Sequence, residues 1–270
     1  MRTTRLFGLN IIADSSANLL AQLEQQLVTR TKRPCQLIYT PNPEQVVLAQ
    51  QQPAFARMLA RADYLLPDGV GLVWAARLLH LFGKTQTSIP ARIAGVELVT
   101  ALLAAAHAQH LPVLIIGGRA YATERSPVSA QRCATERSPV SARRYATDHP
   151  NLHWLEAFAD KTRVTLSEEQ ALAEKILRLR PAIVFVALGA PEQEAWLAEH
   201  RQLLTQAGTK LGMAVGGSFD FIFGKVARAP QLLQTLGLEW LWRLVMQPWR
   251  WRRQLNLLKF IALVGREIAR

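Results

Sequence analysis

The chain alternates short apolar runs with longer segments in which hydrophobic residues recur at helical spacing. Short apolar runs bounded by glycine, proline or polar residues predict buried strands, and the longer periodic segments predict helices. The predicted strands lie at residues 6–13, 35–40, 64–66, 112–116, 182–188 and 211–215. The predicted helices lie at residues 15–30, 43–61, 70–81, 96–110, 167–180 and 192–207. This alternation predicts an α/β fold, a Rossmann-like parallel sheet with helices on both faces.

Local signals support several of the predicted helix starts. Ser15 and Ser167 are candidate caps, and Ser167 is followed by two glutamates in the first turn. Pro43 suits the first position of a helix because it lacks the amide hydrogen that would have no partner there.

Four predicted strands end in turns that contain glycine. The turns are Pro-Asp-Gly at 67–69, Gly-Gly at 117–118, Gly-Ala-Pro at 189–191 and Gly-Gly at 216–217. In open parallel sheets, ligands bind beyond the carboxyl ends of the strands, so these turns are the first candidates for a binding site. The alternative is that each glycine only makes a tight turn from strand to helix.

A twelve-residue unit is duplicated in the middle of the chain. Residues 121–132 read YATERSPVSAQR, residues 133–144 read CATERSPVSARR, and 145–147 begin a third copy. Two copies of so short a unit cannot build a solenoid. We interpret the segment at about 121–147 as a peripheral insertion and expect that deleting one copy leaves activity intact.

The last 31 residues differ in composition from the rest. Residues 240–270 hold four of the seven tryptophans and seven basic residues against Glu267 alone, and Pro248 predicts a break between two helices. Basic, Trp-rich amphipathic helices are typical of a membrane interface. Packing against the core and nucleic-acid binding are alternatives, although the aliphatic content argues against nucleic acid. We therefore predict an α/β domain at 1–225 and a membrane-associating helical appendage at 226–270.

Composition narrows the classes of partner. The 270 residues carry a net charge of +12, which favours an anionic partner. The two cysteines show no disulfide or zinc spacing and predict reduced thiols in a cytosolic protein. We expect a protein without a signal peptide or membrane-spanning run, either soluble or lying on a membrane. Of the histidines, only His107 and His110 have ligand-like spacing, and no third ligand is near them in sequence, so no metal site is predicted. No cofactor is predicted either.

Several strings together resemble one enzyme family. They are TPNPE at 40–44, ADYLLPDGVG at 62–71, RIAGVEL at 92–98, GAPEQE at 189–194, GGSFD at 216–220, GKVARAP at 224–230 and GLEWLWRL at 237–244. In this order, they resemble the WecG/TagA/CpsF glycosyltransferase family (glycosyltransferase family 26), and the similarity runs nearly end to end apart from the duplicated insert.

The resemblance implies an inverting, metal-independent enzyme. Its expected donor is a UDP-sugar carrying N-acetylmannosamine or its uronic acid, and its expected acceptor is N-acetylglucosamine on undecaprenyl diphosphate. The product would serve surface polysaccharide or teichoic acid synthesis. The resemblance further implies a cytoplasmic protein, peripheral on the inner face of the cell membrane, whose appendage docks on the anionic surface and completes the active site. It is compatible with a homo-oligomer and implies no nucleic-acid partner.

The expected chemistry assigns roles to particular residues. An inverting transfer needs a base for the acceptor hydroxyl, and Asp68 in the turn at 67–69 matches the family's position. The alternative is that Asp68 only caps the following helix. By resemblance, Arg243, Arg250 and Arg253 stabilise the leaving diphosphate, for which a permanently charged guanidinium is suited. The alternative is that these arginines contact only lipid headgroups.

A second set of residues is expected to bind substrate. It comprises Thr40, Asn42, Arg92, Gly117, Gly118, Gly189, Gln193, Gly216, Gly217 and Asp220. By resemblance, Thr40 and Asn42 line the pocket near the acceptor or donor sugar. Arg92 could pair with a phosphate or organise Asp68, and the glycines would let the backbone approach the nucleotide. For Asp220, a structural role and a contact with uridine are both open. Glu97 stands where many family members have aspartate.

Two other functions compete with this interpretation. A nicotinamide-dependent oxidoreductase would need a G-x-G-x-x-G fingerprint after a strand, which the sequence at 117–120 does not provide. A non-enzymatic basic protein that binds membranes or nucleic acid would leave the polar residues Thr40, Asn42, Asp68 and Gln193 without a function.

Overall fold

The structure is a computed structural model that describes residues 1–29, 33–117, 150–155, 165–223, 227–235, 237–246, 248 and 251–270. Within these ranges, the side chains of residues 235, 243 and 251–254 are not described. Three predictions lie outside the described residues: the duplicated segment at 121–147, Gly118 and Arg250.

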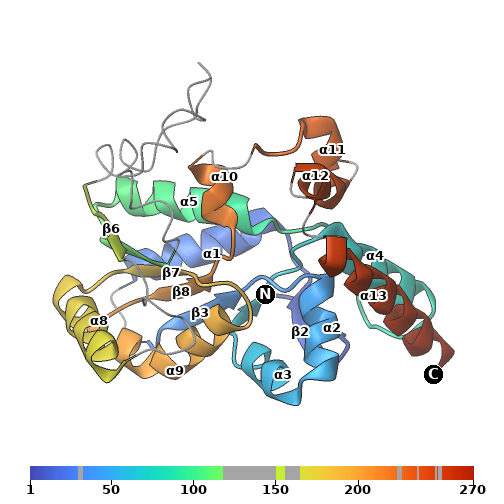
Figure 1. Ribbon diagram of the computed structural model, residues 1–270, viewed down its shortest axis with the longest axis horizontal. Helices are drawn as coiled ribbons and strands as arrows, with labels where there is room; N and C mark the ends of the chain where they lie inside the picture. The colour runs from blue at the N-terminus through green and yellow to red at the C-terminus, as the bar shows by residue number, and fades with distance from the viewer. Residues whose placement is uncertain are drawn as a thin grey trace. The chain divides into compact units, whose positions relative to one another are not determined.

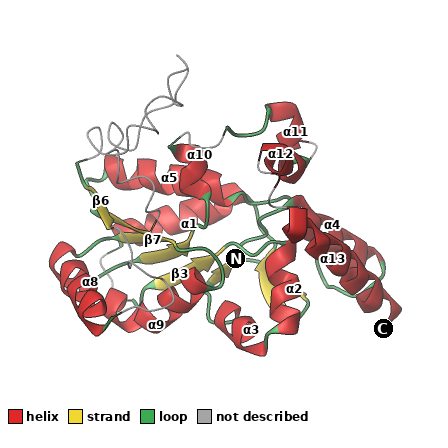
Figure 2. Ribbon diagram, viewed as in Figure 1, coloured by secondary structure: helices red, strands yellow, loops and turns green. Residues whose placement is uncertain are grey.

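The predicted α/β class is confirmed. The strands are β1 (Thr3–Leu6), β2 (Leu9–Ile12), β3 (Gln36–Tyr39), β4 (Tyr64–Leu65), β5 (Val113–Gly117), β6 (Leu152–Leu155), β7 (Ile183–Ala187) and β8 (Leu211–Ala214). Six of them form one sheet in the order β4-β3-β8-β7-β5-β6, and the registered pairs from β3 to β6 are parallel (Figure 2). β1 and β2 form a separate antiparallel pair.

The helices cover the sheet and form the C-terminal segment. They are α1 (Ser16–Val28), α2 (Pro43–Gln51), α3 (Pro53–Leu59), α4 (Val70–Leu81), α5 (Gly95–Ala108), α8 (Leu166–Leu179), α9 (Glu192–Ala207), α10 (Ser218–Ile222), α11 (Gln231–Thr235), α12 (Glu239–Met246) and α13 (Trp251–Ala269). Figure 1 shows α5 on one face of the strands β7 and β8, and α8 and α9 on the other. The predicted break at Pro248 is confirmed, because α12 ends at Met246 and α13 begins at Trp251.

The chain divides into two compact units. The first contains residues 1–21, 39–98 and 226–270, and the second contains residues 22–38 and 99–225. In the second unit, the strands β5, β7 and β8 are almost completely buried, as expected for a parallel sheet covered on both faces. In the first unit, α13 packs against α2 and α4. Among the helices of the described residues, none is long and apolar enough to span a bilayer.

Three predictions about elements were wrong. The predicted strand at 6–13 is part of the β1–β2 hairpin, whose turn residues Phe7 and Gly8 have φ of 51° and 83°, the left-handed values that a two-residue hairpin turn needs. The predicted helix at 43–61 is divided between α2 and α3 at Pro53, which cannot donate the backbone hydrogen bond that continuation requires.

The third error concerns the cap of α8. Thr165, rather than Ser167, caps this helix: its hydroxyl accepts a hydrogen bond from the Glu168 N–H at 3.3 Å, and the Glu168 carboxylate accepts one from the Thr165 N–H at 2.9 Å. This reciprocal pair is a capping box, which satisfies two amide groups at once. The strand β6 and the short helices α10 and α11 were not predicted, since their apolar runs are too short to show a period.

Candidate functional site

Asp68 lies in a half-buried turn of the first unit. The chain leaves β4 with the Leu66 N–H donating to the Tyr39 carbonyl at 2.8 Å. The Asp68 N–H then donates to the carbonyls of Pro41 at 3.1 Å and Leu66 at 2.9 Å. Gly69 occupies the N-cap position of α4 without a side-chain capping bond, so Asp68 is not the cap residue. Asp68, the predicted base, therefore lies at a strand end and is only partly buried.

Thr40 and Asn42 lie beside this turn. Both are half-buried and follow β3, as predicted. The Asn42 side chain caps α2: its oxygen accepts from the Gln45 N–H at 3.0 Å, and the Gln45 side chain accepts from the Asn42 N–H at 3.3 Å. The Pro41–Asp68 hydrogen bond joins the loops after β3 and β4, so Thr40, Asn42 and Asp68 are brought together. Sequence reasoning missed the capping role of Asn42, although the N-P-E-Q pattern carries that signal.

Glycine allows the two loops to approach closely. Gly69 has φ of 115°, in the region that only glycine adopts readily, and a Cβ there would lie 3.3 Å from Pro43 Cδ. A Cβ on Gly71 would lie 2.8 Å from Pro43 Cγ. The glycines of the PDGVG string therefore let the start of α4 pack on the start of α2.

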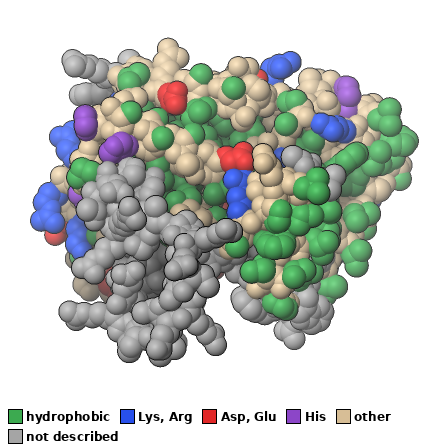
Figure 3. Space-filling model, turned by 90° about the horizontal axis from the view of Figure 1, so that it is seen from above, with side chains coloured by type: hydrophobic (Ala, Val, Ile, Leu, Met, Phe, Trp, Pro, Cys, Tyr) green, Lys and Arg blue, Asp and Glu red, His purple; other side chains and the backbone are tan. Residues whose placement is uncertain are grey.

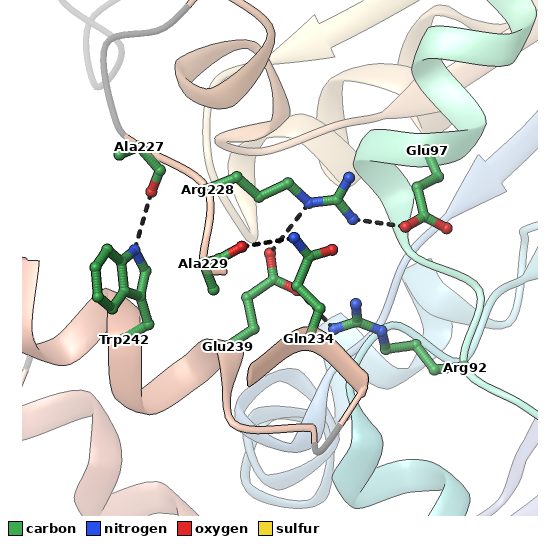
Figure 4. Close-up of polar contacts among 8 residues, drawn as sticks. All are labelled: Arg92, Glu97, Ala227, Arg228, Ala229, Gln234, Glu239 and Trp242. Carbon is green, nitrogen blue, oxygen red and sulfur yellow. Dashed lines mark hydrogen bonds and ion pairs between the residues drawn. The ribbon is translucent and has the colours of Figure 1, made fainter. Parts of the chain in front are cut away.

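Four charged side chains form a network near this turn (Figure 4). An Arg92 nitrogen donates to Glu239 at 2.8 Å, and an Arg228 nitrogen donates to Glu97 at 2.6 Å. Arg228 Nε also lies 3.7 Å from the second Glu239 oxygen. Arg92 was predicted to contact a phosphate or Asp68, and the structure pairs it with Glu239. Sequence reasoning missed Arg228 and Glu239 as site residues, although both lie in the strings that resemble the family.

The predicted diphosphate-binding arginines lie in the C-terminal segment. Arg243 is in α12 and Arg253 is in α13. The side chains of Arg243 and Arg253 and the whole of Arg250 are not among the residues that the structure describes. Contact between these arginines and a ligand therefore stays a prediction.

In the second unit, Gln193 links two predicted binding turns. Its side-chain oxygen accepts from the Gly216 N–H at 3.0 Å, and its amide donates to Glu194 at 2.8 Å. Both side chains are buried. Gly189 and Gly216 have φ of 89° and 51°, in the left-handed region that glycine adopts readily. The structure thus brings Gln193 to the carboxyl ends of β7 and β8, and Glu194 is a buried neighbour that the sequence did not single out.

Gly217 and Asp220 follow Gly216 at the end of β8. Gly217 precedes α10, and its carbonyl accepts from the N–H of the half-buried Asp220 at 3.2 Å. Both therefore lie beside the turn that Gln193 holds, and their contact with substrate stays a prediction.

Gly117 has a structural reason to be glycine. Its φ is 100°, and a Cβ there would lie 2.7 Å from the Ala187 carbonyl oxygen of the neighbouring strand β7. Its own carbonyl accepts from the Trp154 indole at 2.8 Å. The close contact with β7 is therefore enough to explain the glycine at this position, and no ligand has to be invoked.

The first unit also carries an apolar groove between α4 and α13. The groove encloses about 510 Å³ and is lined by side chains that include Trp74, Leu78, Leu257, Phe260 and Ile261. Trp74 is 64% exposed although it is large and apolar. In Figure 3, hydrophobic side chains gather on the side where α4, α12 and α13 lie in Figure 1. An exposed apolar patch of this kind marks a surface that contacts protein, ligand or membrane.

Comparison with known proteins identifies the family. The model of the glycosyl transferase WecG/TagA/CpsF family matches residues 4–270. A Bacillus spizizenii protein is 31% identical over 264 residues, which cover 98% of this chain and 91% of that protein. A Bacillus subtilis protein is 28% identical over 269 residues, covering 99% and 93%. Both are named N-acetylglucosaminyldiphosphoundecaprenol N-acetyl-beta-D-mannosaminyltransferase. This chain therefore belongs to the WecG/TagA/CpsF family and is a glycosyltransferase.

Proposed function

We propose that this glycosyltransferase moves N-acetylmannosamine from a UDP donor to N-acetylglucosamine on undecaprenyl diphosphate, with inversion at the anomeric carbon. The name shared by the two relatives, which align with 98% and 99% of the chain, carries the transferred sugar and the acceptor of this proposal. The UDP donor and the inversion are what the resemblance to the family implies. A transferase that acts on a lipid-linked acceptor in this way would serve cell-wall teichoic acid or another surface polysaccharide.

Asp68 is the proposed general base. The Asp68 carboxylate removes the proton from the acceptor hydroxyl while that oxygen attacks the anomeric carbon and the bond to UDP breaks on the opposite face. Its place in a half-buried turn after β4, beside Thr40 and Asn42, supports this role. Those two residues are proposed to contact the sugars.

The leaving UDP needs positive charge, and Arg243, Arg250 and Arg253 are the proposed source. Diphosphate accepts bidentate hydrogen bonds from guanidinium groups, which stay charged at any working pH. In the second unit, Gln193, Asp220 and the turns after β5, β7 and β8 are the proposed nucleotide contacts.

Residues 226–270 are the proposed membrane-associating part, on the inner face of the cell membrane. The apolar groove between α4 and α13 and the exposed Val245, Leu258 and Ile261 support this role. An isoprenoid-linked acceptor resides in the bilayer, so an enzyme that acts on it gains from an apolar surface beside its site.

The test is release of UDP and transfer of sugar in the presence of a short-chain lipid diphosphate N-acetylglucosamine acceptor, over a panel of UDP-sugars. We expect turnover with UDP-N-acetylmannosamine that requires the acceptor. In Asp68→Asn, kcat should fall by roughly 10²–10⁴-fold because proton transfer is lost. Asp63→Asn, the same change at an exposed position before β4, is the control and should stay near wild type. Absence of turnover with every donor contradicts the proposed function, and a folded, fully active Asp68→Asn contradicts the role of the base.

A further inference from the structure

The ion-pair network of Figure 4 joins three separate parts of the first unit. Arg92 precedes α5, Arg228 lies in the segment before α11, and Glu239 is the first residue of α12. The Arg92 and Glu239 side chains are only 20% and 16% exposed. Ion pairs shielded from water to this degree are weakened less by salt than fully exposed pairs, which contribute little.

One side of the network is bound to the turn that carries Asp68. The Ile93 N–H donates to the Pro67 carbonyl at 3.1 Å. Arg92 and Asp68 are the chain neighbours of these two residues. The backbone that holds the Arg92 guanidinium is therefore connected by one hydrogen bond to the residue before the proposed base.

The other side of the network is the first turn of α12. Glu239 there accepts from Arg92 and faces Arg228, and a carboxylate in the first turn also interacts favourably with the helix dipole. The Trp242 indole donates to the Ala227 carbonyl at 3.1 Å, which is a second tie between α12 and the segment containing Arg228. Arg243 follows Trp242 in the same helix, so these contacts determine where its backbone lies.

We propose that Arg92, Arg228 and Glu239 are positioning residues that fix α12, and with it Arg243, relative to the turn that carries Asp68. This inference rests on the proposed function. Transition-state stabilisation depends steeply on geometry, and a displacement of about 1 Å can cost a hundredfold in rate. Arg92 thus acts through Glu239, and its guanidinium does not bind the substrate phosphate.

A double-mutant cycle with Arg92→Gln and Glu239→Gln tests the proposal. Each single change should lower kcat about tenfold or more while the KM for the UDP-sugar changes little. A displaced Arg243 loses most of its effect in the transition state, where the charge on the leaving diphosphate grows as its bond to the sugar breaks. The double variant should be no slower than the slower single variant, since both changes break the same pair. Arg92→Lys keeps the charge and should retain most of the activity. If Arg92 instead bound substrate, the two losses would add and the KM would rise.

Hydrogen exchange of the substrate-free protein provides a readout that needs no activity. Both single variants should speed amide exchange across α12 while exchange in α4 and α9 and the thermal midpoint stay close to wild type. Glu174→Gln, the same change at an exposed position in α8 of the second unit, is the matched control and should change neither exchange in α12 nor turnover. Unchanged exchange in α12, or additive losses in the cycle, would overturn the proposal. If the wild-type enzyme shows no turnover with any UDP-sugar, only the proposed function is contradicted. The amide exchange rates in α12 would then still test whether Arg92 and Glu239 position this helix.

Discussion

At the scale of single residues, Asp14 shows how local hydrogen bonds set an electrostatic property. Its carboxylate accepts from the Asn18 side chain at 2.8 Å, from the Ser15 N–H at 2.9 Å and from the Arg2 N–H at 3.4 Å. The Asn18 hydrogen bond, followed by those from Ser15 and Arg2, lowers the pKa of Asp14 below its ordinary value of 3.8. The charged carboxylate therefore ties the N-terminal hairpin to the start of α1.

A group whose pKa is lowered in the folded state stabilises that state above its unfolded pKa, and the contribution disappears as pH falls through the folded value. Asp14→Asn should therefore destabilise the protein at pH 7, and its difference from wild type should shrink between about pH 4 and pH 2. Urea unfolding of both proteins across this range checks the expectation. A difference that stays constant down to pH 2 would contradict it.

Gln193 is a residue whose place at a strand end, though not its contacts, could be predicted. The turn after a parallel strand is a general place for binding residues, so Gln193 was a candidate from position alone. Its hydrogen bond to Gly216 depends on how β7 and β8 are paired in register. No local pattern contains that information.

At the scale of elements, two glycines at strand ends have different reasons to be glycine. Both have left-handed φ, 100° at Gly117 and 89° at Gly189. A Cβ at Gly117 would meet the β7 backbone at 2.7 Å, while a Cβ at Gly189 would have nothing within 4 Å. The first glycine is required by strand packing and the second only by its backbone conformation.

This difference predicts the stability of two variants. Gly189→Ala should cost about 1–2 kcal/mol in the free energy of unfolding, the usual cost of a left-handed alanine. Gly117→Ala should cost about 1–3 kcal/mol more, because strands β5 and β7 must separate to admit the methyl group. Urea denaturation of the two variants gives both values. If both variants lose the same free energy of unfolding, the structure accommodates the new methyl group beside the Ala187 carbonyl without a measurable cost.

At the scale of the whole molecule, the net charge and the exposed apolar side chains support the proposed membrane association. The chain carries a net charge of +12, and the C-terminal helices expose Val245, Leu258 and Ile261. Apolar insertion combined with charge attraction is the way amphipathic helices hold anionic membranes. The duplicated segment at 121–147 lies outside the described residues, and its peripheral role stays a prediction.

Binding to vesicles separates the lipid and substrate roles of the arginines. Wild-type protein should bind vesicles of anionic lipid more tightly than zwitterionic ones, and salt should weaken that binding. Replacing Arg243, Arg250 and Arg253 with alanine should also lower turnover on a short-chain acceptor free of membrane. The control replaces the exposed Arg57, Arg61 and Arg178, an equal loss of charge. If the variant lacking Arg243, Arg250 and Arg253 keeps full turnover, these arginines contact only lipid and do not stabilise the leaving diphosphate.

The order of residues was enough to establish the α/β class, the family and the candidate turn at Asp68. Hydrophobic period, helix-breaking proline and motif order depend on neighbours along the chain, so they are visible without a structure. The pairing of Arg92 with Glu239, 147 residues away, depended on tertiary packing, as did the contact of Gly117 with β7. Contacts between distant segments follow from how helices and strands pack together, and the periodicity of each segment alone does not specify the partner.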